Sequence, residues 1–143
     1  MYEKILLPID LHDSSSWEDA IPVAVRQCEA NDAALHILYV MSKVHPSVAA
    51  FMADDIDEET RQQEAERQLA EFASKIGDQG AEVTYQVASG DSIYDEVLKC
   101  RERIGADLIV MTAHRPDLSD YLIGPNAARI VRHAPCSVFV VRK

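Results

Sequence analysis

The chain begins with the apolar run Ile5-Leu6-Leu7-Pro8-Ile9, and three similar runs follow at residues 34–40, 107–111 and 137–141. Short continuous apolar runs predict strands that are buried on both faces, as in a parallel sheet. Residues 83–87 alternate polar and apolar side chains, which predicts a fifth strand at one edge of the sheet.

Helical spacing occupies the segments between these strands. Apolar residues three and four positions apart predict helices over 17–28, 69–76 and 93–104. Pro22 predicts a late start or a kink in the first of them, because proline lacks a backbone N–H. Residues 126–133 are predicted to form a last short helix.

Strands that alternate with helices imply right-handed crossovers and a doubly wound sheet. We therefore predict a single α/β domain over residues 1–143. Its core is a Rossmann-like parallel sheet of five strands, in the order 3-2-1-4-5, with helices on both faces. Residues 42–56 are predicted to form a flexible connection within this domain.

Composition excludes several classes of function. The net charge of −10 repels nucleic acid and anionic lipid, and no apolar run is long enough to cross a membrane. Residues 54–66 alone sum to −6, as expected of a solvated helix face. Three widely spaced cysteines, Cys28, Cys100 and Cys136, lie within apolar patterns and indicate a reducing compartment. Because the N-terminus also lacks a signal-peptide pattern, we predict a cytoplasmic protein without nucleic-acid or membrane partners.

One candidate site residue follows the first predicted strand. Ligands of open α/β sheets bind at the carboxyl ends of the strands, where the strand order reverses, here between the first and fourth strands. Asp10 lies at this point and can hold a ribose hydroxyl or a Mg²⁺ ion. The alternative is a turn residue, with Ser14 or Ser16 capping the next helix.

The loop after the fourth strand carries a basic pair and a helix start. His114 and Arg115 follow the strand, and Gly124 opens the last helix. Free N–H groups and the helix dipole attract anions there, and Arg115 can add a bidentate contact to phosphate. Taken singly, His114 could be a local hydrogen-bonding residue and Gly124 a simple cap. Their convergence at one position of the fold favours an anion site.

Three segments of the chain are characteristic of one family. They are Lys4-Ile5-Leu6-Leu7-Pro8-Ile9-Asp10, residues 106–111, and the ending Val131-Arg132-His133-Ala134-Pro135-Cys136-Ser137-Val138-Phe139-Val140-Val141. On these segments the whole chain resembles the universal stress protein family. The sequence His114-Arg115-Pro116 is most similar to the short bacterial members of the F and G type.

The chain departs from the phosphate loop of the family's ATP-binding members, which has the form Gly-x2-Gly-x9-Gly-Ser/Thr. Thr112 stands where the first glycine is expected, the second glycine has no counterpart, and the loop is one residue shorter. Gly124 is retained, but Pro125 replaces the serine or threonine. Since proline suits the first position of a helix, we expect a weakened phosphate site and not an abolished one.

The resemblance implies a homodimer that binds ATP, ADP or AMP, with the last strand, Val138 to Val141, as the dimer edge. It implies no catalytic residue and no resident metal, although Asp10 could contact Mg²⁺. The implied nucleotide-binding residues are Pro8, Ile9, Asp10, Val40, Met111, Thr112, His114, Arg115, Gly124, Pro125, Asn126 and Ala127.

Two alternative functions stay open at this point. Because of the altered loop, the protein could be a dimeric interaction protein that no longer binds ATP. It could also be a slow ATPase or an autophosphorylating protein, with His114 or Ser119 as the acceptor. The sequence contains no Ser-His-Asp or Cys-His hydrolase arrangement, no zinc-ligand spacing and no Walker-type loop.

Overall fold

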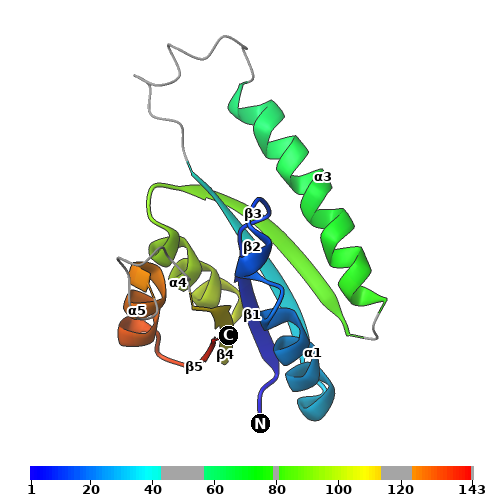
Figure 1. Ribbon diagram of the computed structural model, residues 1–143, viewed down its shortest axis with the longest axis vertical. Coiled ribbons are helices and arrows are strands. Elements are labelled where there is room, and N and C mark those ends of the chain that lie inside the picture. Colours follow the sequence, from blue (N-terminus) through cyan, green and yellow to red (C-terminus); the bar gives the residue numbers. More distant parts are fainter. Residues whose placement is uncertain (43–56, 79–80, 114–123, 143) are drawn as a thin grey trace.

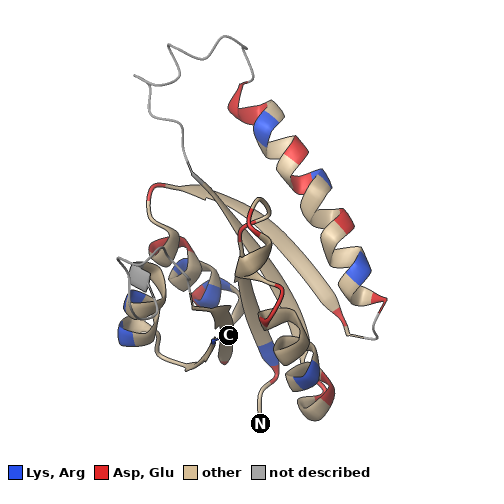
Figure 2. Cartoon of the chain, viewed as in Figure 1, with Lys and Arg blue, Asp and Glu red and all other residues tan. Residues whose placement is uncertain are grey.

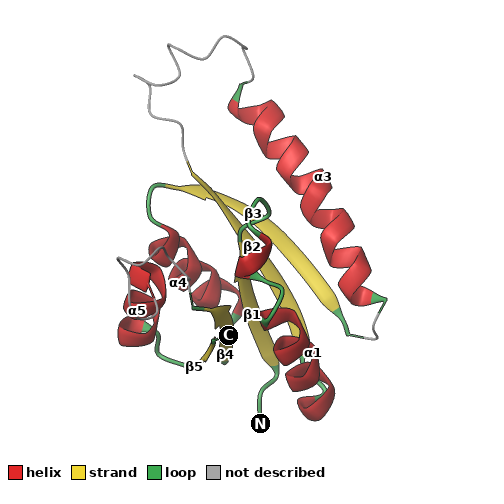
Figure 3. Cartoon of the chain, in the orientation of Figure 1, coloured by secondary structure: helices red, strands yellow, loops and turns green. Residues whose placement is uncertain are grey.

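The computed structural model describes residues 1–42, 57–78, 81–113 and 124–142. These residues form a parallel sheet of order β3-β2-β1-β4-β5 with helices on both faces (Figures 1 and 3). The doubly wound fold and its strand order are thereby confirmed. Its strands are β1 (Lys4–Ile9), β2 (Ala34–Ser42), β3 (Val83–Gly90), β4 (Leu108–Thr112) and β5 (Ser137–Val141). Its helices are α1 (Ala20–Asn31), α3 (Glu58–Gly77), α4 (Ile93–Ile104) and α5 (Gly124–His133), with the 3-10 turn η1 at Ser14–Ser16.

The sheet separates two apolar layers. Ile5 and Leu7 of β1 face α1 and α3, whereas Leu6 faces α4 and α5. All three side chains are fully buried, because successive residues of a strand point to opposite faces and both faces carry helices. The continuous apolar run of the sequence is therefore explained by burial on both sides.

Helix α1 starts late, as Pro22 predicted. It begins at Ala20, so Pro22 lies in the first turn, where backbone N–H groups have no partner within the helix. The alternative in which Ser14 or Ser16 caps this helix is wrong. Asp19 occupies the cap position without a side-chain hydrogen bond, and the hydroxyl of Ser16 instead lies 2.7 Å from the carbonyl oxygen of Asp13.

Helix α3 begins well before the apolar repeat that predicted it. Asp57 caps its start by accepting the backbone N–H of Thr60 at 2.7 Å. The predicted stop at Gly77 is confirmed, since Gly77 is the last helical residue. Residues 43–56 precede this helix and lie outside the described residues, so the predicted flexible connection is described only at Ser42, the end of β2.

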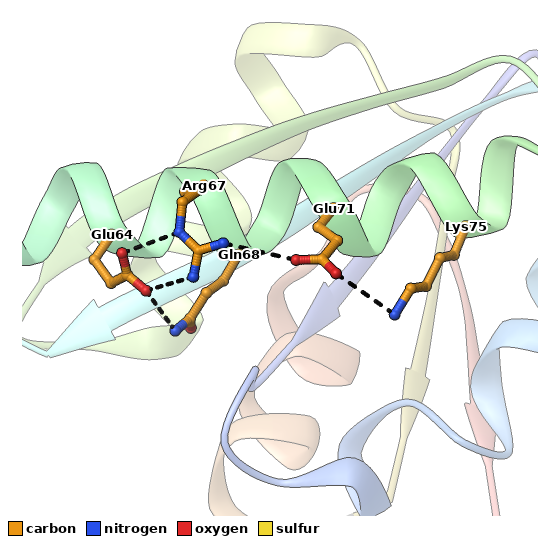
Figure 4. Close-up of polar contacts among 5 residues, drawn as sticks. All are labelled: Glu64, Arg67, Gln68, Glu71 and Lys75. Carbon is orange, nitrogen blue, oxygen red and sulfur yellow. Dashed lines mark hydrogen bonds and ion pairs between the residues drawn. The ribbon is translucent and has the colours of Figure 1, made fainter.

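The solvent face of α3 carries a row of ion pairs (Figure 4). Arg67 contacts Glu64 at 2.7 Å and Glu71 at 3.7 Å, and Lys75 contacts Glu71 at 3.9 Å. Charged residues lie along this helix, whereas the central strands are almost free of them (Figure 2). Exposed pairs of this spacing contribute little to the stability of a helix, because solvent screens the charges.

The cysteines are free thiols. Cys28 and Cys100 are buried and Cys136 is half-buried. Burial, reinforced by Glu29, raises the pKa of Cys28 to about 11, so this thiol is inert near neutral pH.

No helix in the described parts of the chain is long and apolar enough to cross a membrane.

Candidate functional site

A cavity of about 420 Å³ lies at the carboxyl ends of β2, β1 and β4. Strand order reverses here, because β1 pairs with β2 on one side and with β4 on the other. The volume is within the range of small-molecule sites. The lining residues that the structure describes are Pro8, Ile9, Asp10, His12, Asp13, Ser15, Ser16, Tyr39, Val40, Met41, Arg61, Ile93, Val97, Met111, Thr112, Ala113 and Ile130.

A tight turn after β1 presents Asp10 to this cavity. The carboxylate of Asp10 accepts the backbone N–H of His12 at 3.0 Å. The backbone N–H of Asp10 donates to the Ser16 hydroxyl at 2.8 Å. Asp13 accepts the Ser15 hydroxyl at 2.6 Å. Asp10 is therefore a turn residue and also an exposed carboxylate at the cavity, so its two predicted roles are compatible.

The β2 wall combines an apolar surface with a phenol. Tyr39 is 7% exposed, and its ring meets that of His12 edge to face at 6.1 Å. Burial raises the pKa of Tyr39, the nearby charge of Asp10 raises it further, and Arg61 acts in the opposite direction. Tyr39 therefore stays a neutral hydroxyl at physiological pH, flanked by a carboxylate and a guanidinium.

The β4 wall ends in a hydroxyl. The Oγ1 atom of Thr112 is buried and has no hydrogen-bond partner among the described residues. Its neighbour Ala113 is held in place, because its N–H donates to the carbonyl oxygen of Val141 at 2.9 Å. Fully buried Val97 of α4 and Ile130 of α5 complete an apolar side of the cavity.

The family model "Universal stress protein family" matches residues 1–142. The chain belongs to the universal stress protein family. A protein named universal stress protein G from Shigella flexneri is 33% identical over 144 aligned positions, which cover 99% of this chain and 100% of that protein. The family predicted from the sequence is thereby confirmed.

Two solved structures of universal stress proteins have the same fold. One is a universal stress protein in complex with cAMP, with a TM-score of 0.67 and 20% identity over 99% of this chain and 97% of that one. The other is a universal stress protein from Archaeoglobus fulgidus in complex with dAMP, with a TM-score of 0.67 and 18% identity over 97% of each chain. At this identity the likeness concerns the fold alone.

The structure of this universal stress protein brings half of the predicted site residues together at the cavity. Three strands contribute them, and the six are Pro8, Ile9, Asp10, Val40, Met111 and Thr112.

The other predicted residues lie at or before α5. Helix α5 begins at Gly124, as the loop pattern predicted, and Pro125 follows as its second residue. Asn126 and Ala127 lie in the first turn of α5 and are not among the described residues that line the cavity. His114 and Arg115 fall outside the described residues. The predicted phosphate contacts of this loop therefore stay predictions.

Sequence reasoning missed several residues of the cavity. His12 and Ser15 lie in the loop of Asp10, and Tyr39 directly precedes Val40, so position in the strand–loop pattern could have found them. Arg61 gave no such signal, because it lies in the acidic segment that was interpreted as a solvated helix face.

Proposed function

We propose that this universal stress protein binds an adenine nucleotide, ATP, ADP or AMP, in the cavity at the carboxyl ends of β1 and β4. The observation that carries the proposal is the cavity itself. It lies at the switch point, has apolar walls of Ile9, Val40 and Met111, and holds the carboxylate of Asp10 beside them. The solved structures of universal stress proteins in complex with cAMP and with dAMP support an adenine ligand.

The lining residues suit the separate parts of a nucleotide. Apolar side chains can enclose a base, and the Asp10 carboxylate can accept hydrogen bonds from ribose hydroxyls. The start of α5 offers N–H groups and a positive dipole end to phosphate, with Pro125 at a position where no helix bond is lost. The carboxylate of Asp10 is also a ligand of the type that Mg²⁺ prefers, so it would be a contact for a metal ion bound with the phosphates.

The test is the melting temperature of nucleotide-stripped protein with ATP, ADP or AMP, each with Mg²⁺. A ligand at 100 times its dissociation constant stabilises by about 2.7 kcal/mol, a rise of several degrees for a chain of this size. GTP and CTP serve as controls for the base. If no nucleotide raises the melting temperature at millimolar concentration, the proposal is wrong, and the alternative of a nucleotide-free interaction protein takes its place.

We further propose that the protein acts as a cytoplasmic, dimeric stress-response protein and pairs through β5. Strand β5 ends the sheet in the order of the described strands, and Val138 to Val141 are only half-buried there. Unpaired apolar edges favour pairing with another strand. Three free cysteines agree with a reducing compartment.

The dimer is tested by sedimentation of wild type and of Val140→Lys, since an edge lysine opposes strand pairing. The matched control is Val131→Lys, which adds the same charge at an apolar side chain of α5 that is 47% exposed. We expect twice the chain mass of 15.9 kDa for wild type and the control, and a monomer for Val140→Lys. A monomeric wild type would contradict the dimer without bearing on nucleotide binding.

A further inference from the structure

One charged side chain enters the cavity from α3. Arg61 is the only lysine or arginine among the described lining residues. Its side chain is 27% exposed, whereas Arg67 on the same helix is 62% exposed. Arg61 is therefore partly enclosed, and Arg67 belongs to the solvent face.

The turn that carries Arg61 is positioned by local contacts. Arg61 pairs with Glu58 at 3.5 Å, one turn earlier. Its neighbour Gln62 donates from its side chain to the carbonyl oxygen of Val87 in β3 at 3.3 Å. The hydrogen bond from Gln62 places the first turns of α3 beside β3.

The order of the strands places Arg61 and α5 on opposite sides of the cavity. The sheet order is β3-β2-β1-β4-β5, so the α3 wall lies beyond β2, and α5 follows β4. Neighbouring strands lie about 4.8 Å apart, so the cavity extends roughly 10 Å from β2 to β4. A nucleotide with its phosphates at the start of α5 and its ribose at Asp10 therefore has its base over β2.

We propose that Arg61 contacts the nucleobase of the bound nucleotide and not its phosphates. This inference rests on the proposed function and assigns one residue to the base end of that site. A guanidinium is planar and carries only donors, so it can stack on the base or donate to its ring nitrogens. In either geometry the contact is independent of the number of phosphates. Ammonium, a compact point charge, does not reproduce it.

The experiment measures dissociation constants for adenosine, AMP, ADP and ATP by calorimetry. Three variants are compared with wild type: Arg61→Gln, Arg61→Lys and the control Arg67→Gln. The control removes the same charge from the same helix and also breaks an i, i+3 pair with a glutamate. Melting temperatures without ligand verify that each variant is folded.

We expect Arg61→Gln to weaken all four ligands by the same factor, about tenfold. Arg61→Lys should lose nearly as much affinity for each ligand, and Arg67→Gln should have the dissociation constants of wild type. A loss that is absent for adenosine and grows from AMP to ATP, with recovery in Arg61→Lys, would overturn the inference in favour of a phosphate contact. Unchanged binding in Arg61→Gln would overturn it as well. If wild type binds none of the four, the proposed function fails first, and this outcome is distinct from the other two.

Discussion

The carboxylate of Asp107 accepts the backbone N–H of Glu3 at 2.9 Å, across 104 positions of the chain. The same carboxylate accepts the N–H of Lys4 at 3.1 Å, and the N–H of Asp107 donates to the carbonyl oxygen of Lys4 at 3.0 Å. These contacts join the start of β1 to the start of β4. The two strands that flank the cavity at their carboxyl ends are thus fastened together at their amino ends.

Replacing Asp107 by alanine should destabilise the protein by about 1–3 kcal/mol, because two backbone donors lose a charged acceptor. The measurement is urea unfolding followed by circular dichroism. Asp107→Asn is the matched variant, since its amide oxygen still accepts one of the bonds, and it should lose less. Equal stability of wild type and Asp107→Ala would show that solvent replaces this carboxylate.

Gly90 should tolerate no side chain while Glu96 keeps its position. A Cβ atom on Gly90 would lie 2.6 Å from Oε1 and 2.7 Å from Cγ of Glu96. We expect Gly90→Ala to cost about 1 kcal/mol, the low end of overpacking, because the clash involves only the side chain of Glu96, which is 20% exposed. In the background Glu96→Ala the same change should be neutral or slightly stabilising, because alanine restricts the unfolded chain. The four proteins form a double-mutant cycle, and a coupling energy near zero would contradict the steric explanation.

His36 should make stability depend on pH below neutrality. It is 8% exposed, and Nδ1 lies 2.7 Å from the hydroxyl of Thr84. Burial holds the pKa of His36 below its ordinary value of 6.5, and the charges of Arg103 and Lys4 lower it further, against a hydrogen bond to Gln86 that raises it. The unfolded chain therefore takes up this proton at a higher pH than the folded protein does.

The contribution of His36 is fully present above pH 6.5 and is lost as the pH falls toward the pKa of the folded state. We expect the free energy of unfolding to fall less between pH 7 and pH 5 in His36→Gln than in wild type. The control is His133→Gln, which removes an exposed histidine and leaves the buried one in place. Parallel pH profiles for His36→Gln and wild type would contradict the prediction.

Asp10 allows a test that separates binding from folding. Asn at this position can still accept the N–H of His12 and keep the turn, but it has lost the charge. We expect Asp10→Asn to lower the affinity for AMP about tenfold, since a hydrogen bond to a charged group is worth about 1.5 kcal/mol or more. Its melting temperature without ligand should equal that of wild type. Unaltered affinity for AMP would show that Asp10 does not contact the nucleotide.

The sheet could be predicted because its determinants are local. A short apolar run such as residues 5–9 is typical of a strand that is buried on both faces, and the helical spacing between the runs predicts the crossovers. Exact ends depend on partners instead. The third strand was predicted to end at residue 87. It continues to Gly90, because β2 extends to Ser42 and pairs with β3 along this whole length. A single segment does not contain that information.

The site could be predicted only in part, for a similar reason. Asp10 and Met111 follow from the rule that places ligands at strand ends. Arg61 depends on how α3 packs, through contacts such as that between the rings of Trp17 and Phe72, whose centroids lie 5.0 Å apart. The serine cap failed because the Ser16 hydroxyl is used within the turn of Asp10.

Helix α3 is anchored unevenly, and this has a consequence for exchange with solvent. Its buried residues are Ala65, Leu69, Ala73 and Ile76, so nothing before Ala65 is buried. The first two turns, which hold Arg61, can fray at a fraction of the global free energy, whereas the later turns open only with the core. Amide hydrogens near residue 61 should exchange by local opening and slow selectively when a ligand occupies the cavity. A contact between Arg61 and a ligand therefore gives less affinity than it would on a rigid helix, because binding must also order the first two turns of α3.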